Sequence, residues 1–183
     1  MSVDDEFERL VAGLVPQPAT RHGWIAVVLT PVASASALAG LCAMSGVNCT
    51  VVPSTTGAVA ARELPPPDDP FAALVTDVPP AAEELAATLS RLTHTEVLLL
   101  VARLGTDHDG ETAGQLTAHR YAAGEAAGEV PPGLALASAD GVVEDLLLGQ
   151  VALADVPGGE DTGQIPRWKA ARMFTRGLKK RKP

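Results

Sequence analysis

The C-terminal segment, residues 167–183, contains the densest group of side chains that could act on a partner. It holds eight of the 14 basic residues in the chain and no acidic residue. Guanidinium and ammonium groups form strong, charge-assisted hydrogen bonds with carboxylates and phosphates. The sequence therefore predicts an anion-binding element made of Arg167, Lys169, Arg172, Arg176, Lys179, Lys180, Arg181 and Lys182.

The spacing within this segment is helical. An apolar arc of the helical wheel contains Trp168, Ala171, Phe174 and Leu178. The basic side chains gather on the other side, although Arg167 lies within the apolar arc, and Gly177 weakens the helix near its end. We expect Trp168, Phe174 and Leu178 to act as the apolar anchor of a basic amphipathic helix. Helices of this kind bind membrane surfaces, acidic grooves or nucleic-acid phosphates.

The charge of the rest of the chain limits the choice of partner. Residues 1–166 carry all 22 acidic and only six basic residues. An acidic body with a basic tail indicates an anionic partner for the tail. The expected partner is a protein, an RNA-containing assembly or anionic lipid, and the acidic body disfavours duplex DNA. Homo-oligomerisation is left open, as is simple docking of the tail on its own domain.

Ser34 and Ser36 form a second candidate site, at the start of a helix predicted over residues 34–45. Free N–H groups and the helix dipole favour an anion at such a position. The same serines are also accounted for by ordinary N-capping. This site supports an alternative function, a small-ligand sensor or enzyme with a pocket at the start of this helix.

The sequence predicts no catalytic residue, no metal site and no cofactor. The four histidines are scattered without ligand spacing, and the chain contains no nucleotide-binding or nucleophile-elbow motif. The polar loop 107–111 collects metal-compatible side chains, but it does not match the EF-hand pattern. Cys42 and Cys49 lack zinc-type spacing, and we expect both to be small buried apolar residues.

The stretch 24–54 organises the predicted fold, because no charged residue occurs between Arg21 and Arg62. It predicts a strand over residues 24–30, the helix over 34–45 and a strand over 49–53. A strand over 71–78, a helix over 79–92 and a strand over 96–104 follow, whereas residues 57–64 fit either a strand or a helical turn. The fold class is thus α/β (α+β), with a ferredoxin-like β-α-β-β-α-β core. A small doubly wound sheet is the alternative.

Weaker patterns flank this core. An acidic amphipathic helix and linker are expected over residues 1–18, and a single domain over 22–156. Within that domain we expect a hairpin that pairs 115–123 with 134–138, a helix over 142–148 capped by Asp140, and a final strand over 151–156. The Gly-, Pro- and Asp-rich residues 157–166 predict a flexible linker before the tail.

Taken together, these patterns favour a non-enzymatic cytoplasmic interaction or regulatory module that contacts an anionic partner through its basic tail. The acidic start of the chain is unlike a secretory signal, which indicates the cytoplasm or the periphery of a membrane. The richness in Ala and Gly is typical of GC-rich bacterial genomes. A further alternative is a single-span membrane protein, because residues 24–47 are uncharged over the length of a bilayer.

Overall fold

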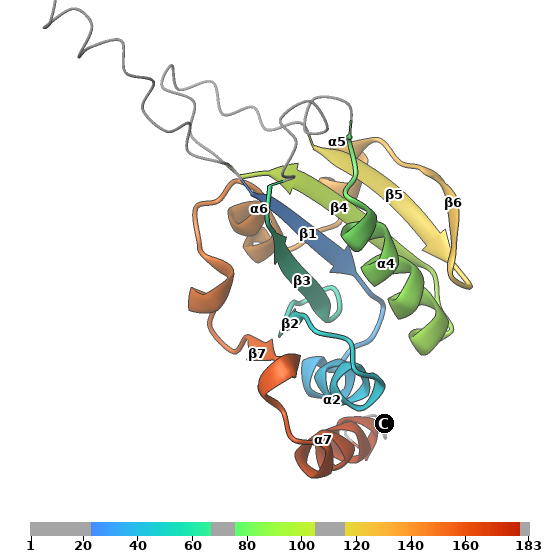
Figure 1. Ribbon diagram of the computed structural model, residues 1–183, viewed down its shortest axis with the longest axis vertical. Helices are drawn as coiled ribbons and strands as arrows, with labels where there is room; N and C mark the ends of the chain where they lie inside the picture. Colours follow the sequence, from blue (N-terminus) through green and yellow to red (C-terminus); the bar gives the residue numbers. More distant parts are fainter. Residues whose placement is uncertain (1–22, 67–75, 105–115, 180–183) are drawn as a thin grey trace, which may run out of the picture.

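The computed structural model describes residues 23–66, 76–104 and 116–179, and its strands form one antiparallel sheet in an α+β fold (Figure 1). The seven strands lie in the order β6-β5-β4-β1-β3-β2-β7, and all their pairings are antiparallel. The strands are β1 (Trp24–Leu29), β2 (Thr50–Val52), β3 (Val59–Leu64), β4 (Val97–Arg103), β5 (Thr117–Ala122), β6 (Glu125–Glu129) and β7 (Glu160–Asp161). The helices are α2 (Ala35–Ser45), α4 (Pro80–Thr93), α5 (Pro132–Ala137), α6 (Gly141–Leu147) and α7 (Arg167–Lys179), with short 3-10 turns η1 (Leu153–Asp155) and η2 (Thr162–Gln164). The predicted α+β class is confirmed.

The core of the sheet follows the connectivity β1-α2-β2-β3-α4-β4. In space these strands lie in the order β4-β1-β3-β2, so β3 separates β1 from β2. The ambiguous segment 57–64 thus supplies a central strand. Most of the strand expected over 71–78 lies outside the described residues, and residues 76–78 are not in a strand. The doubly wound alternative, which requires mainly parallel neighbours, is wrong.

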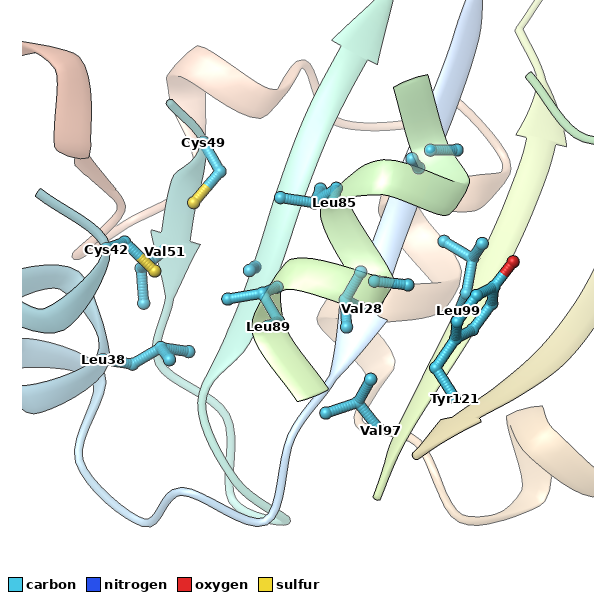
Figure 2. Packing of buried hydrophobic residues seen from close by; sticks show 14 of the residues in the cluster. Val28, Leu38, Cys42, Cys49, Val51, Leu85, Leu89, Val97, Leu99 and Tyr121 are labelled. Atoms are coloured by element: carbon cyan, nitrogen blue, oxygen red, sulfur yellow. The ribbon is translucent and has the colours of Figure 1, made fainter. Parts of the chain in front are cut away.

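Strand β1 is buried on both faces, as its unbroken apolar sequence predicts. Trp24, Ala26 and Val28 belong to one hydrophobic cluster, which α2 and α4 cover. Ile25 and Val27 belong to a second cluster on the opposite face, which α5, α6 and η1 cover. Figure 2 shows the first cluster, in which side chains from both covering helices meet those of the sheet. The sheet is therefore the middle layer of three.

Both ends of α2 are formed as the sequence predicts. The hydroxyl of Ser34 accepts a hydrogen bond from the N–H of Ala37 at 3.3 Å, which makes Ser34 the N-cap. Gly46 ends the helix with a φ of 73°, a left-handed conformation that suits glycine. Because α2 and β1 are separate elements, the predicted membrane span over 24–47 is wrong. None of the helices in the described part of the chain is long and apolar enough to cross a bilayer.

The prediction of a hairpin after residue 115 is wrong in its second strand. Strand β5 pairs with β6, and residues 134–138, expected to form that strand, lie mainly in helix α5. Ala123 and Gly124 connect β5 to β6, with φ values of 52° and 89°. Positive φ at both central residues is the requirement of a type I′ hairpin turn. The Ala-Gly pair is a weak signal for this turn, because the residue usually found before the glycine is Asn or Asp.

Three further predictions after residue 138 are corrected. Asp140 does precede α6, but its carboxylate accepts hydrogen bonds from the N–H and hydroxyl of Thr55, at 2.9 and 3.0 Å, instead of capping the helix. These bonds lower the pKa of Asp140. The strand expected over 151–156 is instead the turn η1. The segment expected as a linker, 157–166, contains β7 and η2.

Tyr121, the only tyrosine in the chain, is expected to lose its phenol proton at a higher pH than a tyrosine in an unfolded chain. Burial of the ring on the α4 face, then the charge and hydrogen bond of Glu83, raise its pKa to about 12. The folded chain thus holds this proton more tightly than the unfolded chain, whose pKa is about 10. We therefore expect the free energy of unfolding to fall as the pH rises from about 10 to about 12. Ultraviolet absorbance of tyrosinate, recorded with and without urea, measures both midpoints; equal midpoints would contradict this expectation.

Candidate interaction surface on the C-terminal helix

Helix α7 lies against α2, on the side of α2 away from the sheet (Figure 1). The side of α7 that faces α2 consists of Ala170, Met173, Phe174 and Gly177, at helical spacing. Ala170 is fully buried, and the other three are partly buried. The apolar part of α7 is thus used within the chain itself, as the simple docking alternative expects.

Small residues allow the two helices to approach closely. A Cβ added to Gly40 of α2 would lie 2.6 Å from the carbonyl oxygen of Ala170 and 2.8 Å from the backbone nitrogen of Phe174. A Cβ added to Gly177 of α7 would lie 2.5 Å from the Cβ of Ala37. Real Cβ atoms do not approach other heavy atoms so closely, so glycine is required at both crossings. Gly177, which the sequence marks as a weak point of the helix, is therefore a packing residue.

The docked side of α7 differs from the apolar arc read from the sequence. Trp168 is 70% exposed, and Ala171 is exposed as well. Only Phe174 of the predicted anchors is shown to contact α2, since the side chain of Leu178 lies outside the description. The apolar arc of the helical wheel includes the large indole of Trp168, whereas the backbone of α7 at Ala170 and Phe174 lies directly against Gly40 of α2. The matching small residues, Ala170 and Gly177, are the signal that could have identified the docked side.

The sides of α7 that do not pack on α2 carry the predicted basic group. The side chains of Arg167, Lys169, Arg172 and Arg176 are all exposed. No carboxylate in the described part of the chain forms an ion pair with any of these four. Lys179 closes the helix, whereas its side chain and the residues Lys180, Arg181 and Lys182 lie outside the described part of the chain. The four described cations thus share one helix and face solvent.

The segment before α7 fixes the helix to the sheet. Strand β7 pairs with β2 at the sheet edge, where Thr50 lies opposite Asp161. Thr162 follows, buried, and its hydroxyl accepts a hydrogen bond from the N–H of Cys49 at 2.9 Å. The single proton of this hydroxyl is shared between the carbonyl oxygens of Val47 at 2.7 Å and Cys49 at 2.8 Å. Helix α7 therefore starts from a fixed point beside the loop that leaves α2.

A cavity of about 760 Å³ opens at the start of α2, where the sequence placed the ligand alternative. Ser34 and Ser36 line it, together with Phe174 and Gly177 of α7. The Ser34 hydroxyl already caps α2, and the wall is mainly apolar. The structure therefore brings Ser34 and Ser36 to one cavity, whose lining also includes Thr93 and Thr95.

The two cysteines are the small buried residues that the sequence predicts. Both are free, and their exposed fractions are 0% for Cys42 and 5% for Cys49. A hydrogen bond to Cys49 and burial hold the pKa of the Cys42 thiol well above its usual range. Among the residues that the structure describes, no three His, Cys, Asp or Glu side chains are grouped to hold a metal ion. The acidic loop 107–111 lies outside those residues.

Comparison with models of known protein families, with characterised proteins and with solved structures gave no match for this chain.

Proposed function

We propose that the protein is a non-enzymatic interaction module that contacts an anionic macromolecule through the exposed face of α7. One observation carries the proposal: α7 buries its small and apolar side on α2 and presents Arg167, Lys169, Arg172 and Arg176 to solvent. Packing and the β7–η2 segment hold these cations on one ordered helix. Less conformational entropy is then lost on binding than with a free tail.

The charge distribution supports the same function. Within the described part of the chain, residues up to 166 include 13 acidic and four basic side chains. A cationic helix on an acidic body concentrates attraction for an anionic partner on one surface. The acidic remainder disfavours nonspecific contact elsewhere. Such an arrangement needs no substrate, cofactor or metal to operate.

Reversing two charges on α7 is expected to abolish partner recovery. The variant with Arg172→Glu and Arg176→Glu keeps the docked side of the helix intact, because both side chains are exposed. Affinity purification from lysate at low and high salt compares it with the full wild-type chain. We expect wild type to recover a partner that salt releases, and the variant to recover none.

The matched control makes the same change of net charge elsewhere. Arg91→Glu with Arg120→Glu alters two exposed arginines on α4 and β5, away from α7. This control should recover the partner as wild type does. Equal loss in both variants would show that net charge matters rather than α7, and unchanged recovery in the α7 variant would refute the proposal.

A further inference from the structure

The outward side of α7 forms a ridge with a defined composition. Trp168, Arg172 and Thr175 follow one another at i, i+4 and i+7, so they stack along the side opposite Ala170 and Gly177. All three are exposed, with Lys169 and Arg176 flanking the ridge on one side. The Trp168 indole is 70% exposed between cations, so it is largely unpacked within the described part of the chain and open to a partner. Trp and Arg are the side chains most enriched where protein partners gain most of their binding energy.

A membrane surface fits this ridge poorly. A helix that lies in a bilayer interface inserts a continuous apolar face. On α7 that role would fall to Met173 and Phe174, but both pack toward α2. The outward ridge offers one indole and otherwise polar or charged side chains. Insertion would therefore require α7 to leave α2.

An extended nucleic acid also fits poorly. Single-stranded nucleic acid is held by a cationic groove that follows its backbone for several nucleotides. Helix α7 has 13 residues and is about 20 Å long. Next to it, α2 contains no charged residue, and the hollow that includes Lys169 also contains Glu160 and Asp161. A polyanion that ran from α7 across α2 or across the hollow with Glu160 and Asp161 would meet neutral and acidic surface.

We propose that the ridge binds a short acidic protein segment whose apolar side chains cover the Trp168 indole. Carboxylates of that segment pair with Arg172, Arg176 and Lys169 by charge-assisted hydrogen bonds. The negative charge of such a segment is confined to the length of α7, so the acidic body does not oppose it. This inference rests on the proposed function and specifies its partner.

Tryptophan fluorescence of the full chain tests the partner class. The chain has two tryptophans, and Trp24 is 3% exposed with the Arg103 guanidinium 4.6 Å from its ring centroid. A change in emission on binding thus reports Trp168. The three probes are a Glu-rich peptide with Leu at every fourth position, single-stranded RNA of similar length, and vesicles containing phosphatidylserine.

We expect a saturable, salt-sensitive blue shift with the peptide alone. Arg172→Ala should weaken that binding by about tenfold or more, whereas Arg120→Ala on β5 should not change it. Trp168→Phe should remove the spectral response and weaken binding measured by calorimetry. A stronger response to RNA or vesicles would overturn this inference but leave the proposed function standing. No binding of any probe would overturn both.

Discussion

Replacing Gly40 by Ala is expected to lower the free energy of unfolding by about 1–3 kcal/mol, the usual cost of overpacking. In an open helix position the same change would stabilise by up to about 1 kcal/mol, because Ala is the better helix former. At Gly40 the new Cβ would meet backbone atoms of α7 at 2.6 and 2.8 Å. Backbone cannot rotate away as a side chain can, so α7 must shift from α2.

Two measurements check this expectation, urea unfolding followed by circular dichroism and the rate of tryptic cleavage within α7. Cleavage should be faster in the Gly40→Ala variant. The side chains of Arg172 and Arg176 are already exposed, but the peptide bonds after them become accessible to trypsin only when α7 loosens from α2. The control is Gly133→Ala in α5, where an added Cβ has no neighbour within 4 Å. If both variants behave alike, close helix packing does not hold α7.

The sequence predicts best those elements whose local signals agree with one another. Helix α2 shows this, because its cap at Ser34, its termination at Gly46 and its apolar composition all indicate the same bounds. Strand β1 is equally clear, since its run of apolar residues predicts a strand buried on both faces and the structure buries it in two clusters. In both cases the physical cause lies within about ten neighbouring residues.

Elements that depend on distant partners are predicted poorly. Residues 157–166 have the composition of a linker, yet Asp161 pairs with Thr50 and Thr162 bonds to Cys49, more than a hundred residues away in the chain. The docked side of α7 is similar, because Gly40 of α2 decides which residues can face it. The candidate site therefore has predictable charges, but its orientation depends on a helix crossing that no local pattern encodes.

Thr162→Val is expected to lower the free energy of unfolding by about 2–4 kcal/mol, although the two side chains have nearly the same shape. The valine methyl cannot accept from the Cys49 N–H or donate to the Val47 carbonyl, two bonds that the hydroxyl now makes at 2.9 and 2.7 Å. A buried polar group left without a partner costs about 1–3 kcal/mol. The Cys49 carbonyl keeps one donor, because the backbone N–H of Thr162 also bonds to it at 2.9 Å.

Thr162→Ser is the matched control, since it keeps the hydroxyl and loses only a methyl group, worth about 1 kcal/mol. Urea unfolding measures how much each variant lowers the free energy of unfolding. Comparing the two decreases separates the contribution of the hydrogen bonds from that of packing. If the valine variant is as stable as the serine variant, the buried hydroxyl does not fix this segment. If it is much less stable and α7 also becomes more accessible to trypsin, the bonds of one threonine join the sheet edge to the helix that carries the cations. The position of the candidate surface would then depend on a contact between residues 49 and 162 rather than on α7 alone.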